Sequence, residues 1–461
     1  MPSRSRAVLA ALLGLFLVPL FVAPADAAER RSCAKSVKDR DGDCIANTRD
    51  RDIDGDRIPN HRDSDMDGDR KRNSRDSDVD GDRVPNARDR QPFGVQVKGT
   101  RYGVAAPGRV RIARTTKQAV AGLPRGLRVP RAFLGVVAED ALAETGPAGA
   151  PAMPRIAASG VGLLRQTFSW RNIELRPGVL DFSAYDAFVA DAARRGIDLL
   201  PILFDPPAFR SSAPSGQTRM TYPPASDAAF AMFAAILVAR YGPTGSFWSA
   251  RPDVPRRPIR AWQVWNEPNL KAYWGGKPDA VAYTRMLKTV HRAIRSVDPS
   301  ATVVTAGLPE SRLGDSPRRF LARMYRAGAK GHFQALALNP YATTADGVLE
   351  ILVAMRRQMN KAKDRAAMWV TEIGWATTGT SSTYDLGEKA HAAVVTQTVA
   401  LLARNAKRLN LRGVVYYAWR DLPVYEGGRD FWGLHTGLLS QDGTPKPAYR
   451  ALTSLLRRLA R

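Results

Sequence analysis

From Phe133 onward, short apolar runs alternate with longer segments in which apolar residues recur every three or four positions. The short runs predict buried strands and the longer segments predict amphipathic helices, an alternation typical of a parallel sheet covered by helices. We expect eight strands, at Leu134–Ala138, Gly162–Gln166, Asp198–Phe204, Ala261–Trp265, Thr302–Ala306, Ala335–Asn339, Met368–Glu372 and Val414–Trp419. Eight strands over about 330 residues suit a (β/α)8 TIM barrel, an α/β fold, which we assign to residues 131–461.

The helices between these strands carry their own start and stop signals. The segment Ser183–Asp186 has the form of a capping box, so we expect a helix that begins there and stops at Gly196. After the amino-terminal region, no segment is apolar enough along its length to predict a membrane-spanning helix. Two further helices are predicted from apolar residues at helical spacing: Phe230, Phe233 and Leu237 in one, and Tyr283, Leu287, Val290 and Ile294 in the other.

The amino terminus has the order of a secretory signal peptide. Arg4 and Arg6 precede an apolar run at Ala7–Ala23, and the small-residue tripeptide Ala25-Asp26-Ala27 follows. This order predicts that residues 1–27 are cleaved off. An uncleaved membrane anchor is the alternative, since the apolar run almost spans a bilayer. With cleavage we expect a secreted protein, extracellular or associated with the cell surface, and no stable membrane insertion.

Two stretches before the barrel show no hydrophobic period. Cys33 and Cys44, the only cysteines, follow the predicted cleavage site closely, and in an exported protein such a pair favours one disulfide bond. Residues 91–130 are rich in Gly, Pro, Arg and Lys, and we interpret them as a linker with a short strand near Gly108–Ala113.

An acidic repeat lies within residues 28–90, where Asp-Gly-Asp recurs four times at thirteen-residue intervals. Apart from Ile53, Ile58, Val79 and Val84 there is almost no apolar residue, so we expect no hydrophobic core here. Clustered carboxylates repel one another unless a cation neutralises them, and a hard dication takes about six to eight oxygen ligands. We therefore predict structural Ca2+ bound by the recurring acids and asparagines: Asp39, Asp41, Asp43, Asn47, Asp50, Asp52, Asp54, Asp56, Asn60, Asp63, Asp65, Asp67, Asp69, Asn73, Asp76, Asp78, Asp80, Asp82, Asn86 and Asp89.

The spacing of the repeat excludes an EF-hand loop, because the glycine is at the fourth position and no bidentate glutamate closes the loop. It also leaves no room for the helix of a dockerin. The unit at Asp52–Asp63 resembles the bacterial thrombospondin type 3 repeat, a resemblance that implies calcium binding. Arg57, Arg70 and Arg83 stand where that family has a second glycine, and they lower the negative charge. The alternative is a disordered spacer in which arginines and aspartates neutralise each other without metal.

The formal net charge of +25 belongs to the carboxyl-terminal part of the chain. From Glu29 to Arg90 there are 17 acidic and 16 basic residues, whereas from Gln91 onward there are 26 acidic and 51 basic residues. Most of these cations lie on predicted helices, with no run of five or six together. A solvated outer surface explains them, and we expect no nucleic-acid partner. An anionic polysaccharide or cell-wall polymer stays open as a substrate or docking partner.

Two glutamates stand where a barrel collects its functional residues, at the carboxyl ends of the strands. The fourth predicted strand ends in Trp-Asn-Glu-Pro-Asn, which contains Glu267, and the seventh ends in Thr-Glu-Ile-Gly-Trp, which contains Glu372. Each motif places a carboxylate directly after an apolar run, where desolvation is costly. One such glutamate alone is typical of a helix cap or an ion pair, but two with these flanking residues favour catalysis.

Together the two motifs resemble clan A glycoside hydrolases, and in detail families five and thirty-nine, which include cellulases and xylosidases. The likeness covers Phe133–Arg461. It implies a retaining mechanism without a catalytic cofactor, in which Glu267 is the acid/base catalyst and Glu372 is the nucleophile. The charge of Glu372 is expected to raise the pKa of Glu267. The resemblance also implies six residues that bind the sugar or support the glutamates: Arg165, Asn266, Tyr341, Trp419, Trp274 and Trp432.

These supporting residues differ in the role that the resemblance implies. Asn266 matches the residue that hydrogen-bonds the sugar 2-hydroxyl, and Tyr341 matches the tyrosine that steadies the nucleophile. Arg165 matches the arginine that keeps the nucleophile ionised, although it could instead form an ordinary ion pair with Glu139 or Glu372. Trp419 matches the aromatic floor under the sugar at the cleavage point. For the loop residues Trp274 and Trp432, stacking on neighbouring sugars competes with ordinary loop packing.

The leading hypothesis is therefore a secreted enzyme that hydrolyses O-glycosidic bonds of a β-linked polysaccharide or oligosaccharide by double displacement. A transglycosylase would use the same two glutamates with an acceptor sugar in place of water. A non-catalytic, calcium-dependent carbohydrate-binding protein of the cell surface is the alternative from another class, and it would need neither glutamate.

Overall fold

The computed structural model describes residues 126–138, 141–142, 152–217, 220–311, 313–378, 383–424 and 430–460, and scattered residues between Arg40 and Asp78. The chain divides into two compact units, Pro19–Val110 and the rest. The predicted signal peptide, both cysteines and the segment near Gly108–Ala113 lie outside the described residues, so these assignments stay predictions.

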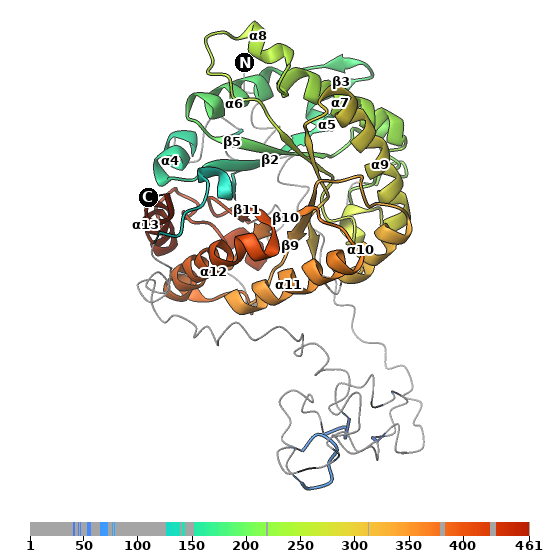
Figure 1. Ribbon diagram of the computed structural model, residues 1–461, viewed down its shortest axis with the longest axis vertical. Helices are drawn as coiled ribbons and strands as arrows, with labels where there is room; N and C mark the ends of the chain where they lie inside the picture. The colour runs from blue at the N-terminus through green and yellow to red at the C-terminus, as the bar shows by residue number, and fades with distance from the viewer. Residues whose placement is uncertain are drawn as a thin grey trace. The chain divides into compact units, whose positions relative to one another are not determined.

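Eight parallel strands close into a barrel (Figure 1). Each strand pairs in parallel with the next, and the last pairs with the first, so the ring is complete. All eight predicted strands are present, and the (β/α)8 barrel is confirmed. In ring order the strands are β1 (Leu134–Val137), β2 (Leu163–Ser169), β5 (Asp198–Phe204), β6 (Ala261–Val264), β7 (Thr302–Val304), β9 (Ala335–Asn339), β10 (Ala367–Ile373) and β11 (Leu411–Tyr416).

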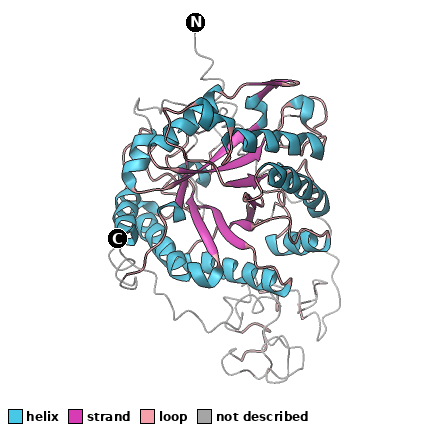
Figure 2. Cartoon of the chain, turned by 45° about the horizontal axis from the view of Figure 1, so that its top comes forward, coloured by secondary structure: helices cyan, strands magenta, loops and turns pink. Residues whose placement is uncertain are grey.

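Helices surround the strands, as Figure 2 shows. The longer ones are α4 (Ala152–Ser159), α6 (Ser183–Arg194), α7 (Asp227–Tyr241), α9 (Ala280–Val297), α10 (Pro317–Arg326), α11 (Ala345–Lys361), α12 (Gly387–Leu409) and α13 (Pro447–Ala460). Short helical turns are η1 (Arg131–Phe133), α5 (Trp170–Ile173), η3 (Ala208–Arg210), α8 (Ser246–Ala250), η4 (Lys271–Tyr273) and η5 (Trp432–His435). An apolar cluster lies inside the barrel, where Val137, Leu163, Leu200, Val304 and Val415 pack together.

Three short strands were not predicted. β3 (Glu174–Arg176) and β4 (Val179–Leu180) form an antiparallel hairpin, and β8 (Leu308–Pro309) pairs with the end of β9. Two or three residues are too few to show a period of two, so no sequence pattern marks these strands.

The predicted capping box at Ser183 is wrong. The helix does begin at Ser183, but its amide hydrogen-bonds the carboxylate of Asp181, two residues earlier, at 2.9 Å. The other member of the expected box, Asp186, instead binds the Arg240 guanidinium and accepts a 2.7 Å hydrogen bond from the Tyr241 hydroxyl. A tertiary ion pair to α7 has displaced the local hydrogen bond that the sequence suggested.

One described segment, Asp227–Ala250, is long and apolar enough by length and composition to cross a membrane, contrary to the expectation that none would be. It comprises α7 and α8. In the structure α7 packs against α9 within the ring of helices, and its Phe230 and Leu237 side chains are fully buried. This helix is therefore apolar because it is part of the packed barrel.

In the amino-terminal unit, the repeat stacks one turn against the next. Gly55 and Gly68 have positive φ angles of 77° and 67°, the left-handed conformation that glycine permits. A Cβ at Gly68 would lie 2.8 Å from a carboxylate oxygen of Asp54 in the preceding repeat. Contrary to expectation, a small apolar cluster exists here: Ile53 and Met66, one period apart, bury each other. Met66 was overlooked because single apolar residues at thirteen-residue intervals do not look like a core.

Candidate active site

Glu267 lies just beyond the end of β6, in a turn with unusual backbone geometry. Trp265 and Glu267 have φ angles of 74° and 45°, a left-handed region that residues other than glycine rarely adopt. The buried Trp265 indole packs edge-on against Phe204 and donates a 2.8 Å hydrogen bond to the carbonyl of Tyr273. These contacts hold the turn, as expected where backbone strain persists at a functional site.

Glu372, next to last in β10, is held by a cation and a phenol. Arg165 on β2 contacts Glu372 Oε1 at 2.7 Å, and the Tyr341 hydroxyl donates to Oε2 at 2.9 Å. Glu372 is only 5 % exposed, and each of its two carboxylate oxygens has one of these partners. Burial and the charges of both glutamates raise the pKa of Tyr341 well above its usual value, so Tyr341 remains a donor. Of the two partners considered for Arg165, Glu139 lies outside the described residues.

The guanidinium of Arg165 ties three strands together. Its Nε donates to Gln263 Oε1 on β6 at 2.8 Å, and its Nη2 donates to Asn266 Oδ1 at 2.9 Å. Because Asn266 accepts through its oxygen, the NH2 group of its amide is the part left to donate to a ligand. Arg165 itself has no exposed surface. It therefore holds both Glu372 and Asn266 in place, and its contact with Glu372 is one of the two ion pairs considered from the sequence.

The electrostatics of the two glutamates differ. Burial is the largest cause that raises the pKa of Glu267 well above its ordinary value, and the negative charge of Glu372 is the second. A hydrogen bond from Asn339 and the charge of Arg165 act in the opposite direction. The sequence suggested the charge of Glu372 as the cause, and the structure adds burial as the larger one. A carboxyl with a raised pKa beside a second carboxylate that is bound by a cation is an arrangement suited to acid–base chemistry.

Two of the three predicted tryptophan platforms are core residues. Trp419 is fully buried and packs edge-on against Tyr449 of α13, with ring centroids 5.7 Å apart. Trp274 is 6 % exposed and packs between Trp265 and Tyr283. Neither ring offers a face to a sugar in this structure. Trp419 lies beyond the end of β11 at Tyr416, and its backbone amide hydrogen-bonds the carbonyl of Val137 on β1 at 2.8 Å.

Trp432 is placed differently, in the turn η5 and partly exposed. Its ring stacks on Tyr384, with centroids 4.5 Å apart and planes inclined by 23°. On another side it meets Tyr341 edge-on at 5.2 Å. Since Tyr341 hydrogen-bonds Glu372, the Trp432 ring lies one residue away from the glutamate pair.

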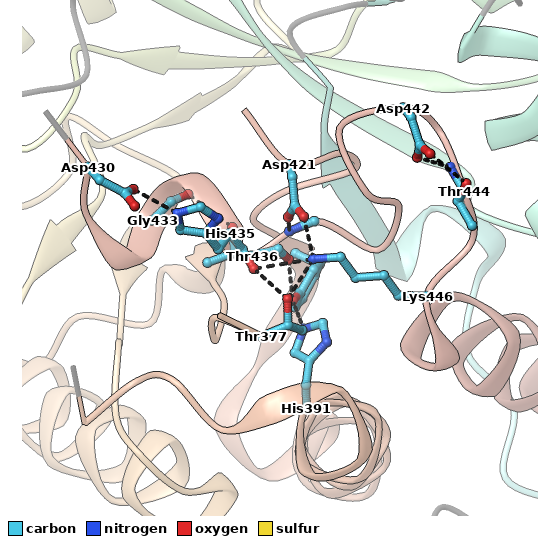
Figure 3. A network of polar contacts seen from close by, with 12 residues as sticks. Thr377, His391, Asp421, Asp430, Gly433, His435, Thr436, Asp442, Thr444 and Lys446 are labelled. Carbon is cyan, nitrogen blue, oxygen red and sulfur yellow. Dashed lines mark hydrogen bonds and ion pairs between the residues drawn. The ribbon is translucent and has the colours of Figure 1, made fainter. Parts of the chain in front are cut away.

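A cluster of polar contacts holds the segment that carries Trp432 (Figure 3). Lys446 lies 2.5 Å from the carboxylate of Asp421 and donates to the Thr377 hydroxyl at 2.8 Å. His435, at the end of η5, contacts Asp430 at 2.7 Å, and its carbonyl accepts from the backbone amide of Thr377. The loop after β10 and the segment before α13 are thereby joined around a buried lysine.

Three residues near the glutamates were not singled out from the sequence as site residues. Gln263 and Asn339 are fully buried polar residues of β6 and β9, and both contact the residues described above. Tyr417 is 6 % exposed, belongs to the cluster inside the barrel, and contributes to the raised pKa of Tyr341. A polar residue within an otherwise apolar strand was the signal that could have identified Gln263 and Asn339.

The predicted calcium ligands are only partly described. The described ones are Asp41, Asn47, Asp54, Asp56, Asp65, Asp67, Asp69, Asp76 and Asp78, and the rest lie outside the described residues. Carboxylate oxygens of Asp65, Asp67 and Asp69 lie within 4.8 Å of one another. Asp67 is nearly buried, and burial raises its pKa, although Arg40 contacts it at 3.2 Å. These three residues offer hard oxygen donors to a cation.

The fold and these residues together define the class of protein as a barrel with a buried pair of glutamates at the ends of β6 and β10. No protein-family model matches the chain, and no curated protein matches it in sequence. Similarity is found among solved structures.

The similar structures are glycoside hydrolases by their names. A family 39 glycoside hydrolase from the gut symbiont Bacteroides cellulosilyticus WH2 has 20 % identity and a TM-score of 0.53, over 70 % of this chain and 63 % of that chain. A monomeric β-xylosidase from Caulobacter crescentus CB15 has 20 % identity and a TM-score of 0.53, over 72 % and 69 %. Xylanase 10B from Thermotoga petrophila RKU-1, in complex with xylobiose, has 15 % identity and a TM-score of 0.50, over 72 % and 95 %.

At these identities the likeness shows the fold. The match spans less than two thirds of the length of the Bacteroides enzyme, so that protein contains parts for which this chain has no counterpart in the match.

Proposed function

We propose that this chain is a secreted retaining glycoside hydrolase that cleaves O-glycosidic bonds of a β-linked polysaccharide or oligosaccharide. The observation that carries the proposal is the pair of buried glutamates, one with a pKa raised by burial and the other bound to Arg165 and Tyr341. Similar folds named as a β-xylosidase and a xylanase make β-xylosides the first substrates to test. Export rests on the signal-peptide pattern of residues 1–27.

The proposed reaction has two steps. In the first, the Glu372 carboxylate attacks the anomeric carbon while the bond to the leaving oxygen breaks, and Glu267 gives its proton to that oxygen. In the second, water attacks the same carbon, the bond to Glu372 breaks, and the Glu267 carboxylate takes a proton from the water. Both glutamates then return to their starting protonation states. A sugar acceptor in place of water would give transglycosylation.

The neighbouring residues have distinct parts in this scheme. Arg165 and Tyr341 orient Glu372 by contacting one carboxylate oxygen each. The amide NH2 of Asn266 is oriented to donate to the sugar 2-hydroxyl. Tyr417, inside the barrel near Tyr341, takes the place under the sugar that Trp419 was expected to fill. Trp432 is the aromatic surface for a neighbouring sugar.

The proposal is tested by hydrolysis of a panel of aryl β-glycosides by the wild type, Glu267→Ala and Glu372→Gln. We expect Glu267→Ala to keep part of its activity on activated leaving groups and to form a β-glycosyl azide when azide is added. Glu372→Gln should be inactive on every substrate. Proton NMR of the first product should show the β-anomer, since double displacement retains configuration.

The matched control is Glu350→Gln, a glutamate on the exposed side of α11, which should leave activity unchanged. If the wild type cleaves nothing but binds oligosaccharides, the barrel is a carbohydrate-binding protein. If the first product is the α-anomer, the retaining mechanism is wrong. With excess acceptor sugar, longer products in place of free sugar would identify a transglycosylase.

We further propose that the acidic repeats bind Ca2+, because Asp65, Asp67 and Asp69 bring oxygen donors together around a glycine turn. Calcium would neutralise carboxylates that otherwise repel one another. Far-ultraviolet circular dichroism and calcium titration calorimetry of the full chain, with and without chelator, test this. Asp67→Asn should weaken binding, and signals that calcium leaves unchanged would favour a metal-free spacer.

A further inference from the structure

A short hydrogen bond joins Asn339 to the proposed acid/base residue. Asn339 is the last residue of β9, and its Nδ2 donates to Glu267 Oε1 at 2.6 Å. Both side chains are buried, with Asn339 fully enclosed and Glu267 7 % exposed. An amide NH2 group only donates, so Oε1 of Glu267 must accept. When Glu267 is protonated, its proton must then lie on the other oxygen, Oε2.

The orientation of this amide is set by a second hydrogen bond. Thr371 on β10 donates from its hydroxyl to Asn339 Oδ1 at 2.7 Å, and its alternative acceptor, the carbonyl of Leu338, is farther away at 3.3 Å. Turning the amide over would bring its NH2 group to face Thr371 and its oxygen to face Glu267. That arrangement would let a protonated Glu267 donate to Asn339, which would hold the proton on Oε1.

Gly307 lies so close to the Asn339–Thr371 hydrogen bond that no side chain fits at this position. A Cβ at Gly307, just after β7, would lie 2.3 Å from Asn339 Oδ1 and 2.7 Å from the Thr371 hydroxyl. Those separations are well inside van der Waals contact, so any side chain at position 307 would displace the pair. Three neighbouring strands thus combine to hold one amide against one carboxyl oxygen.

We infer that Asn339, oriented by Thr371, is a positioning residue that makes Glu267 a proton donor through Oε2 alone. The inference rests on the proposed function of Glu267 and adds a geometric requirement to it. General acid catalysis needs the proton within reach of the leaving oxygen, and a carboxylic acid that held its proton on Oε1 would point it into the barrel wall at Asn339.

The test compares substrates that differ in their need for an acid. The dinitrophenolate group of a dinitrophenyl glycoside leaves with little need for a proton. The leaving oxygen of a methyl glycoside or a disaccharide must be protonated. For Asn339→Ala and Thr371→Val, we expect kcat/KM to fall roughly 10- to 100-fold on the disaccharide and by less than about threefold on the dinitrophenyl glycoside. Thr371→Ser, which keeps the hydroxyl, should restore the wild-type ratio.

The pH profile gives a second readout. Because the Asn339 hydrogen bond lowers the pKa of Glu267, its removal should move the alkaline limb of kcat/KM to higher pH. Asn269→Ala is the matched control, because this buried asparagine donates hydrogen bonds to the carbonyls of Pro309 and Asp315. Its loss should lower kcat/KM equally for both substrates and should not move the alkaline limb of the pH profile. Equal losses on both substrates in Asn339→Ala, with an unmoved limb, would overturn the inference.

A substrate-free measurement separates the inference from the proposed function. The infrared band of the Glu267 carboxylic acid, identified by its absence in Glu267→Gln, can be titrated in the wild type and in Asn339→Ala. We expect a higher titration midpoint and a shifted carbonyl stretch in the variant. An unchanged titration overturns the inference even if the enzyme is active. A shifted titration in a protein that cleaves no glycoside supports the contact and refutes the proposed function.

Discussion

Two buried polar clusters lie next to each other in this barrel, and they are built for different ends. The glutamate cluster comprises Arg165, Glu267, Asn339, Tyr341 and Glu372, and the loop cluster comprises Thr377, His391, Tyr416, Asp421 and Lys446. The consecutive residues Tyr416 and Tyr417 point to opposite faces of the barrel wall. Tyr416 hydrogen-bonds His391 of α12, whereas Tyr417 packs inside the barrel.

The clusters differ in how their charges balance. In the loop cluster, one acid and one base face each other, and Lys446 counteracts the effect of burial on the pKa of Asp421. In the glutamate cluster, two acids share one arginine, and that arginine contacts only Glu372 among them. The second acid is left to hold a proton. Burial and an ion pair are common to both clusters, whereas a carboxyl whose pKa is raised by a second acid distinguishes the glutamate cluster.

The largest expected effect comes from removing the proposed nucleophile. Glu372→Gln should lower kcat by at least about 10^4-fold, because no other carboxylate can form the covalent intermediate. Glutamine still accepts a hydrogen bond from Arg165, and Glu267 ionises more easily once the Glu372 charge is gone, so the melting temperature should change little. Steady-state kinetics together with differential scanning calorimetry measure both. If Glu372→Gln lowers the melting temperature but keeps wild-type activity per folded molecule, Glu372 has a structural role, like the residues of the loop cluster.

The opposite outcome is expected in the loop cluster. Lys446→Met should lower the free energy of unfolding by about 3–5 kcal/mol, because a buried carboxylate at Asp421 loses its partner. Asp421 already has a raised pKa, and without the lysine charge it rises further, so the loss should shrink as the pH falls and Asp421 takes up a proton. Urea denaturation at several pH values measures this.

The double variant Lys446→Met/Asp421→Leu is the matched control. It removes both charges, so most of the lost stability should return. At low temperature, where the double variant is folded, its kcat/KM should fall no further than that of Trp432→Ala. The reason is that the loop cluster affects the substrate only by holding the segment that carries Trp432. A double variant as unstable as the single one would show that the ion pair is not the origin of the effect.

A smaller effect is expected from His391. Tyr416 donates its hydroxyl proton to the carbonyl of Thr436 at 2.7 Å, so His391 donates to Tyr416 and holds its single proton on Nε2. Burial, and then the charge of Lys446, lower its pKa to about 3. The unfolded chain therefore binds more protons than the folded one between about pH 6.5 and pH 3. The stability that this residue contributes is complete above that window and is lost as the pH falls through it.

The corresponding slope is at most about 1.4 kcal/mol per pH unit. Denaturation of the wild type and of His391→Gln between pH 4 and pH 7 isolates it, because other titrating groups cancel in the difference. Parallel curves for the two proteins would mean that His391 has an ordinary pKa in the folded state.

The smallest expected effects distinguish the partly exposed Trp432 from the buried Trp274. Trp432→Ala should raise KM for oligosaccharides about fivefold, roughly 1 kcal/mol of lost stacking, and leave kcat within about twofold. Trp274→Phe should lower stability and leave KM unchanged, because that ring is enclosed by Trp265 and Tyr283. An increase of KM in Trp274→Phe would restore the original assignment of that residue to the substrate site.

Much of the barrel could be predicted because its elements are long and periodic. β5 and β9 have the bounds that the apolar runs indicated, and the other strands differ by a few residues at their ends. The capping box at Ser183 failed because Asp186 has a stronger partner in Arg240, fifty-four residues away. The residues around Ser183 do not reveal that Asp186 has an ion-pair partner elsewhere in the chain, so a local pattern alone could not predict this outcome.

The same limit separates the glutamates from the residues around them. Glu267 and Glu372 are marked by their position directly after apolar strands. Asn339 also ends an apolar strand, but the sequence does not show that it faces Glu267 across β7. Trp419 was assigned from the family resemblance, which does not show that its ring is enclosed against Tyr449 of α13.

The sequence by itself determined the barrel, its strand order and the two acids at its carboxyl end, because hydrophobic periodicity and strand ends are local properties of the chain. Only the tertiary structure decided which acid is paired with Arg165, which amide faces Glu267, and which aromatic rings are enclosed. Those properties depend on distances between strands that are far apart in sequence. They also depend on burial, which sets the pKa of Glu267 and exists only once the barrel is closed.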